Sequence, residues 1–168
     1  MKFSTRARYG LRMMVELARE LQHTDLVHLG KIAKTTGLSE NYLAQLAISL
    51  KNSGLVIGVS GKKGGYQLAK SPDQIKIGEI VESVIGPIAL TECVSHPDIC
   101  LNAGFCETRM VWAYVNTRVQ QALDEFTLAD LTRRDWLEEM HRKHPDMPLL
   151  NVNQIALDGS EDIPPGCP

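Results

Sequence analysis

Residues 28–56 constrain the fold of this chain more than any other stretch, because they read as two short amphipathic helices joined by a tight turn. The first helix is apolar on one face over residues 29–33. Gly37 suits the turn, since glycine adopts a positive φ at little cost. Ser39 is a good N-cap for a second helix that begins at Glu40. This spacing is typical of a helix-turn-helix that places a helix in a DNA groove, although helix hairpins of other small α domains share it.

The second helix has two distinct faces. Its buried stripe is predicted to consist of Leu43, Leu46, Ala47 and Leu50. The opposite face carries Glu40, Asn41, Ala44, Gln45 and Lys51. Amide side chains pair well with base edges, and a helix N-terminus favours phosphate. The DNA contacts expected from this helix are Ser39, Glu40, Asn41, Tyr42 and Gln45.

A basic hairpin is predicted directly after this helix. Residues 55–59 are β-prone, residues 60–65 (SGKKGG) form a flexible tip, and residues 66–68 return as a strand. Lysines on such a tip can lie against the DNA backbone or in the minor groove. A phosphate-binding P-loop is excluded, because the glycine and Gly-Lys-Ser/Thr spacing is absent. The contacts expected from this wing are Ser60, Lys62, Lys63, Gly64, Gly65 and Tyr66.

The distribution of charge supports a DNA-facing first half. The 168 residues carry a net charge of only −2, but residues 1–70 hold eleven Lys/Arg against four Asp/Glu, and residues 71–168 hold seven against sixteen. No run of about eighteen apolar residues is present, so no membrane span is expected. The charged N-terminus does not read as a signal peptide, which favours the cytoplasm.

Three further helices are expected around this motif. Residues 2–21 predict a long first helix, whose Arg6, Arg8 and Tyr9 are candidates for phosphate contact, although solvated arginines would look the same. An amphipathic helix over 77–85 closes the winged domain. A long helix from Glu107 has an apolar stripe that needs a partner. A second copy of the helix is the expected partner, and packing against the first domain is the alternative.

Three cysteines lie in a loop without helical periodicity, residues 87–106. They are Cys93, Cys100 and Cys106, and the fourth cysteine, Cys167, lies far away. Such a group in a cytosolic protein favours metal or redox chemistry over structural disulfides. The spacing suits an iron–sulfur cluster better than zinc, which prefers closer pairs, although His96 would allow a zinc site. Thiol sensing without a metal is the third interpretation.

Several short motifs are spread along residues 1–134. They are TRARYGL at 5–11, YLAQL at 42–46, GLV at 54–56, the glycine-rich segment 61–68, IGEI at 77–80, the three cysteines, and TLADL at 127–131. Together they make the chain resemble the IscR/NsrR type of iron–sulfur winged-helix transcription regulators. The resemblance implies a homodimer with crossing long helices that binds a double-stranded DNA operator. It also implies a 2Fe-2S or 4Fe-4S cluster on Cys93, Cys100 and Cys106 that senses redox state, nitric oxide or iron–sulfur supply.

The chain departs from this family at the expected fourth cluster ligand. The two family positions for that ligand are occupied here by Arg109 and Arg8, and arginine is a poor ligand. The remaining candidates are Glu92, His96, Asp98, Glu107 and a small molecule. Ala44 and Ser60 replace a family glutamate and arginine at the DNA surface, so the operator sequence is expected to differ.

The sequence therefore predicts a mainly α protein with a small β-hairpin wing. Its parts are a winged helix-turn-helix DNA-binding domain (1–86), a cysteine loop (87–106), a dimerisation helix with a short following helix (107–134), and a loosely held C-terminal extension (135–168). The function expected is a dimeric, cluster-gated transcriptional regulator and not an enzyme. The alternatives are a cluster-free regulator that uses its thiols as a switch, and a zinc-stabilised one.

Overall fold

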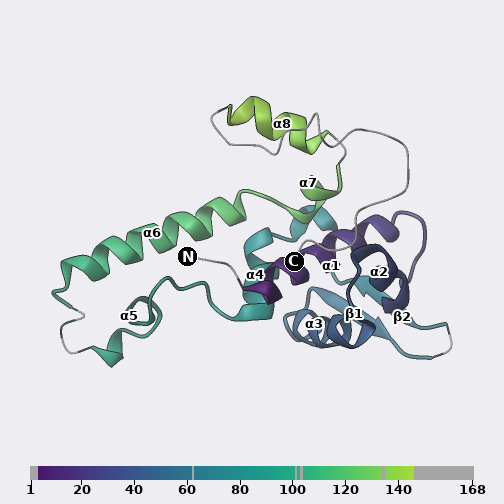
Figure 1. The fold of residues 1–168 in the computed structure, drawn as a ribbon, viewed down its shortest axis with the longest axis horizontal. Coiled ribbons are helices and arrows are strands. Elements are labelled where there is room, and N and C mark those ends of the chain that lie inside the picture. Colours follow the sequence, from purple (N-terminus) through teal and green to yellow (C-terminus); the bar gives the residue numbers. More distant parts are fainter. Residues whose placement is uncertain (1–3, 62, 101, 103, 134, 146–168) are drawn as a thin grey trace.

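The computed structural model describes residues 4–61, 63–100, 102, 104–133 and 135–145 (Figure 1). These residues are mainly helical, with one two-stranded sheet, as the sequence predicts. The helices are α1 (Thr5–Glu20), α2 (Leu29–Thr36), α3 (Glu40–Asn52), α4 (Ile77–Ile85), α5 (Glu92–Ser95), α6 (Glu107–Asp124), α7 (Leu128–Thr132) and α8 (Trp136–Lys143). The strands are β1 (Val56–Val59) and β2 (Gly65–Leu68), and short 3-10 turns occur at Pro72–Gln74 and Pro97–Ile99.

The helix-turn-helix forms where the sequence predicts it. Gly37 ends α2 in the left-handed conformation, with φ 72° and its N–H bonded to Ala33 O. The Ser39 hydroxyl accepts a hydrogen bond from the Tyr42 N–H and so caps α3. Both signals are local, so the turn is set by residues 37–39 themselves.

The hairpin is antiparallel, with Val56 opposite Leu68 and Val59 opposite Gly65. Val27 extends the pairing, because it exchanges two backbone hydrogen bonds with Tyr66, at 3.0 and 2.8 Å. Gly64 permits the tip to close: a Cβ there would lie 2.2 Å from the Val59 carbonyl oxygen. The wing is therefore fixed to the segment that enters α2.

The core of the winged domain lies between α1, α3 and α4. Met13, Met14 and Leu17 of α1 are completely buried. A Cβ at Gly10 would lie 3.0 Å from the Val84 methyl groups, so this glycine lets α1 and α4 pack closely. The predicted stripe of α3 is buried in full and consists of Leu43, Leu46, Ala47 and Leu50. The long first helix thus forms the centre of the domain.

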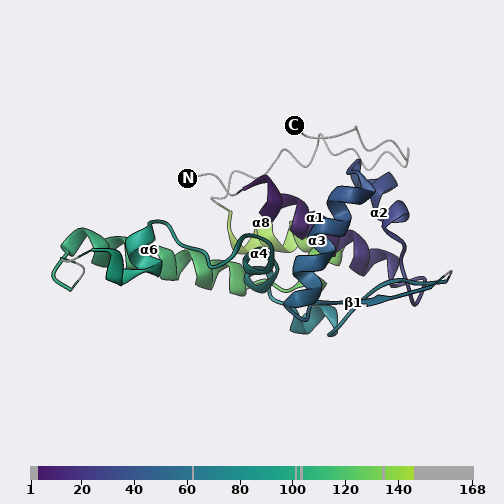
Figure 2. The same cartoon turned by 90° about the horizontal axis from the view of Figure 1, so that it is seen from below.

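Helix α6 projects from this domain (Figures 1 and 2). Its C-terminal part packs on the core through Val119 and Leu123. The chain that follows is tied back to the winged domain, because Ile77 donates its N–H to Phe126 O at 3.1 Å and Leu128 donates its N–H to Ile75 O at 2.9 Å. The N-terminal part of α6 extends away with α5 beside it (Figure 1).

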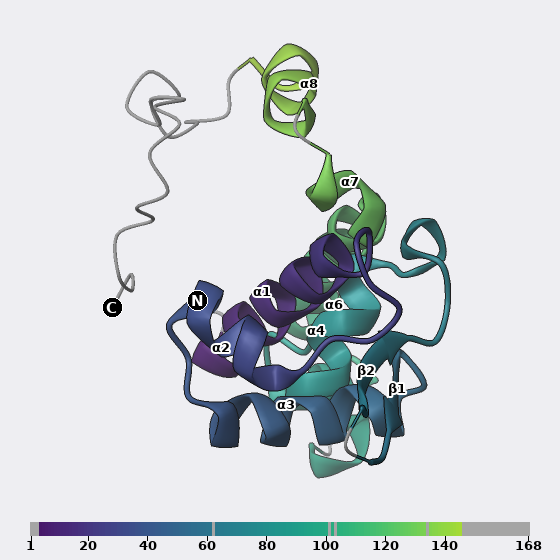
Figure 3. The same cartoon turned by 90° about the vertical axis from the view of Figure 1, so that its right-hand side faces the viewer.

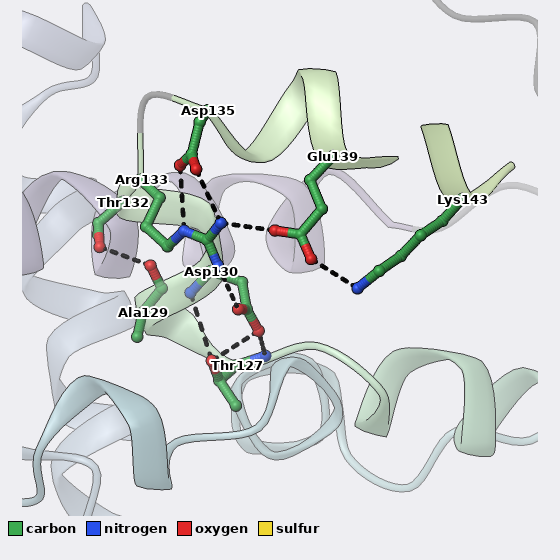
Figure 4. Close-up of polar contacts among 8 residues, drawn as sticks. All are labelled: Thr127, Ala129, Asp130, Thr132, Arg133, Asp135, Glu139 and Lys143. Carbon is green, nitrogen blue, oxygen red and sulfur yellow. Dashed lines mark hydrogen bonds and ion pairs between the residues drawn. The ribbon is translucent and has the colours of Figure 1, made fainter. Parts of the chain in front are cut away.

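A polar network joins α7 to α8 (Figure 4). Thr127 and Asp130 form a capping box at the start of α7. Arg133 forms ion pairs with Asp135 at 3.0 Å and Glu139 at 2.5 Å. Met140 of α8 is 7% exposed. These contacts hold α8 beside α7. The loosely held tail expected beyond residue 145, with Cys167, lies outside the described residues.

Candidate nucleic-acid interface and cysteine loop

The outward face of α3 lies along the edge of the molecule, with the hairpin beside it (Figure 3). Asn41 and Gln45 are exposed on this face, opposite the buried stripe. Lys51 is exposed near the C-terminal end of the same helix. Two amides and a cation thus face outward from one helix, as base and phosphate contacts require.

An open cavity of about 330 Å³ separates α3 from the hairpin. Ile48 and Lys51 line it from α3, and His28 lines it from the start of α2. The predicted wing residues that line it are Ser60, Gly64, Gly65 and Tyr66. The structure therefore brings the predicted wing and recognition helix to one surface. Lys63 is described and Lys62 is not.

A small aromatic cluster stands at the N-terminus of α3. The rings of Tyr9 and Tyr42 meet edge to face, with centroids 6.0 Å apart. The Arg8 guanidinium carbon lies 4.8 Å from the centroid of the Tyr9 ring. Arg8, Tyr9 and Tyr42, which the sequence names separately, are thus one group beside the helix N-terminus, where a phosphate is favoured.

Arg6 lies differently from Arg8. Its Nε donates to the Val84 carbonyl oxygen at 2.5 Å, and a terminal nitrogen donates to Ser49 Oγ at 2.8 Å. Arg6 thereby connects the C-terminal end of α4 with α3. The Glu40 carboxylate lies close to α2, since a Cβ at Gly30 would be 2.9 Å from its Oε1. DNA contacts of Arg6 and Glu40 would have to compete with these interactions.

The cysteine loop holds three thiols that form no disulfide. Cys93 and Cys106 are half-buried and Cys100 is exposed. The Cys93 thiol lies 3.3 Å from Thr91 Oγ1. Across the described part of the chain, no three His, Cys, Asp or Glu side chains come close enough together to hold a metal ion. The three thiols suit an iron–sulfur cluster in kind, because soft thiolates are its usual ligands.

Two side chains of α6 hold the backbone of this loop. Arg109 Nε donates to the Cys93 carbonyl oxygen at 2.7 Å. Asn116 is 5% exposed, and its Oδ1 accepts from the Leu90 N–H at 3.0 Å. Seven positions apart, the two residues lie on one face of the helix. The sequence marks Arg109 only as a position where a family ligand is missing and gives no signal for Asn116, because a contact between a loop and a helix leaves no local pattern.

Cys106 occupies the N-cap position of α6. The hydroxyl of Thr108, 3.1 Å away, lowers the pKa of the Cys106 thiol, and the Arg109 backbone N–H acts in the same direction. Burial and the charge of Glu107 oppose this shift without cancelling it. A lowered pKa favours the thiolate, which is the form that binds metals and reacts with oxidants.

The arrangement of α2, α3 and the hairpin defines a winged helix-turn-helix protein. The sequence model of the Rrf2 family, described as iron-dependent transcriptional regulator, matches residues 3–134. The chain belongs to the Rrf2 family of transcriptional regulators, which are not enzymes. In the part of the chain that the structure describes, no helix is both long and apolar enough to cross a membrane.

The similar proteins within the family include regulators of two kinds, named CymR and IscR. The chain is 39% identical to the HTH-type transcriptional regulator CymR of Bacillus subtilis, over 78% of this chain and 89% of that one. The solved structure of that protein, described as the global cysteine regulator of B. subtilis, superposes with a TM-score of 0.62 over 79% of this chain and 96% of that one. The structure of T. potens IscR gives the same TM-score at 33% identity, over 91% of this chain and 96% of that one.

Proposed function

We propose that this regulator is a cytoplasmic homodimer whose affinity for a double-stranded DNA operator depends on the state of its cysteine loop. The observation that carries the proposal is the position of the three thiols. The loop that holds them connects α4, the last helix of the winged domain, to α6, and Arg109 and Asn116 fix it to α6. A change in the loop would therefore alter how α6 is connected to the winged domain.

The DNA-binding part of the proposal uses the surface of α3 and the wing. Asn41 and Gln45 would read base edges, and Arg8, Lys51 and Lys63 would contact phosphate. The further expected contacts are Tyr9, Ser39, Tyr42, Ser60, Lys62, Gly64, Gly65 and Tyr66. A Lys63→Ala variant should weaken binding to all sequences by a similar factor and reduce the dependence on salt.

The homodimer is supported by the N-terminal half of α6. Large apolar side chains are exposed along it, and they are Met110, Val111, Trp112, Tyr114 and Val115. Contiguous exposed apolar side chains of this kind mark an interface. A second copy of the same helix would cover them and place two α3 helices on the two halves of a symmetric operator.

The loop would hold an iron–sulfur cluster through Cys93, Cys100 and Cys106. When bound, a cluster supplies a redox-active centre that joins three points of the loop. A change in the loop would reach α6 and α3 through side-chain contacts. Asn116 and Arg109 hold the loop backbone against α6, and Arg6 links the end of α4 to Ser49 of α3. Half-site spacing is a strict geometric requirement, so a small tilt of α6 weakens specific binding.

A cluster-free regulator with a thiol switch is the second candidate. Arg109 favours it, because it occupies the family position of a ligand and donates a hydrogen bond to the Cys93 carbonyl oxygen. A zinc-stabilised regulator, with a site formed by the three cysteines and His96, is the remaining alternative.

Purification without oxygen, followed by iron, sulfide and zinc analysis and a visible spectrum, tests the cluster. The proposal expects iron and sulfide with a coloured protein, and loss of colour in each of Cys93→Ala, Cys100→Ala and Cys106→Ala. Cys167→Ala is the matched control and should retain the colour. Colourless protein with stoichiometric zinc would indicate the zinc site, and metal-free protein whose DNA affinity changes when its thiols are blocked would indicate the thiol switch.

A further inference from the structure

The centre of the outward face of α3 is apolar. Ile48 is 61% exposed there, one helical turn after Ala44 and close to the exposed Gln45. Its direction from the helix axis is opposite that of Leu43 and Leu50, which are completely buried. Ile48 therefore contributes nothing to the core of its own domain, and its β-branched side chain slightly disfavours a helix.

Ile48 shares a cavity with an apolar residue of the wing. Both Ile48 and Val59 line the cavity between α3 and the hairpin, and Val59 is 41% exposed. Single exposed aliphatic side chains are ordinary on protein surfaces. Ile48 differs because polar groups that suit DNA flank it on the same helix face, with Asn41 and Gln45 toward the N-terminus and Lys51 toward the C-terminus.

DNA offers one apolar group to such a residue. In the major groove, thymine alone among the four bases presents a methyl group, and side-chain carbons that contact it distinguish thymine from the other bases. We infer that Ile48 is a specificity-determining residue that reads a thymine methyl group in each half of the operator. The inference rests on the proposed DNA-binding function, and it adds an apolar contact to the hydrogen bonds expected from Asn41 and Gln45.

Uracil tests this inference because it differs from thymine only by the missing methyl group. The full-length protein, purified without oxygen, is first used to select bound duplexes from a random library. Each thymine of the selected duplex is then replaced by uracil, and binding is measured. At one position in each half-site, wild-type protein should bind the uracil duplex about fourfold more weakly, the factor expected for one buried methyl group.

The protein variants assign the effect to Ile48. Ile48→Ala should bind the thymine and uracil duplexes equally, and Ile48→Val should retain part of the difference. Ile57→Ala is the matched control, since Ile57 is a 43% exposed isoleucine of the hairpin that does not line the cavity, and it should behave as wild type. Because Ile48 is exposed, Ile48→Ala should melt at the same temperature as wild type.

The outcomes separate this inference from the proposed function. If Ile48→Ala keeps the full preference for thymine, or if uracil has no effect at any position in wild type, Ile48 does not read thymine although the protein binds DNA. If the selection enriches no duplex with this protein or with the same protein after its thiols are blocked, the proposed function fails and the inference fails with it.

Discussion

Helices α1 and α6 are the two longest of the described structure, and they use their apolar residues in opposite ways. Six of the 16 residues of α1 are buried, namely Ala7, Gly10, Met13, Met14, Leu17 and Ala18. Of the 18 residues of α6, Asn116 alone is buried. α1 is surrounded by its own chain, whereas the N-terminal part of α6 extends away from it (Figure 2).

This difference shows which apolar surface is covered by the same chain and which is left exposed. The apolar side of α1 is covered by α2, α3, α4 and α7. The apolar residues at the start of α6 have no comparable cover among the described residues, and the polar Asn116 serves to hold the cysteine loop. The core around α1 is thus completed by α7, which follows α6 in the chain, whereas the start of α6 would be covered in the proposed homodimer.

The largest expected effect comes from a matched pair of methionines. Met14 of α1 is 0% exposed and Met110 of α6 is 70% exposed. Met14→Ala should reduce the free energy of unfolding by about 3–4 kcal/mol, because it leaves a cavity in the core. Met110→Ala should change it by less than about 0.5 kcal/mol in dilute, monomeric protein. Urea denaturation measures both, and equal losses would mean that the two helices do not differ in how their apolar residues stabilise the fold.

Charge placed on the apolar start of α6 should have the next largest effect. Trp112→Glu with Val115→Glu should convert the dimer to a monomer and weaken operator binding about 100-fold, since one winged domain reaches only one half-site. Sedimentation velocity and operator titration measure the two effects. Gln121→Glu, an added charge on the exposed C-terminal part of α6, is the control and should remain dimeric. A double variant that stays dimeric would contradict the proposed interface.

A smaller effect is expected at the joint between the loop and α6. Arg109→Ala removes the hydrogen bond to the Cys93 carbonyl oxygen, so backbone amides of residues 90–100 should exchange with deuterium about tenfold faster. Arg118→Ala is the control, because Arg118 lies on the same helix and bonds Gln121 instead. Unchanged exchange in Arg109→Ala would mean that Asn116 is sufficient to hold the loop.

The smallest effect concerns Asp130, which caps the helix that follows α6. Burial raises the pKa of Asp130, but hydrogen bonds from the backbone N–H and hydroxyl of Thr127 outweigh it, and the pKa lies below its ordinary value of 3.8. A lowered pKa stabilises the fold above the unfolded-state pKa, and the contribution is lost as the pH falls through the folded-state pKa. Asp130→Asn should therefore cost about 1 kcal/mol near neutral pH.

Urea denaturation of wild type and Asp130→Asn over a pH series measures this difference. The gap in unfolding free energy should shrink as Asp130 becomes protonated in acid. A gap that stays constant with pH would mean that the carboxylate charge is not what stabilises α7.

Sequence alone determined the parts of this protein that depend on near neighbours. Gly37, the Ser39 cap and the stripe from Leu43 to Leu50 define the helix-turn-helix, because turn geometry and helical periodicity are written within a few residues. The wing and its glycine tip follow for the same reason. The spacing of the three cysteines also predicts a functional loop, and that function stays a prediction.

Which of these residues meet across the chain depends on the tertiary packing. It placed Arg6 on Val84 and Ser49, brought Arg8 beside Tyr9 and Tyr42, and used Arg109 and Asn116 to hold the cysteine loop. The reason is physical: hydrogen bonds between residues far apart in sequence, such as Arg6 and Val84, depend on how whole helices pack, and no local pattern records that packing.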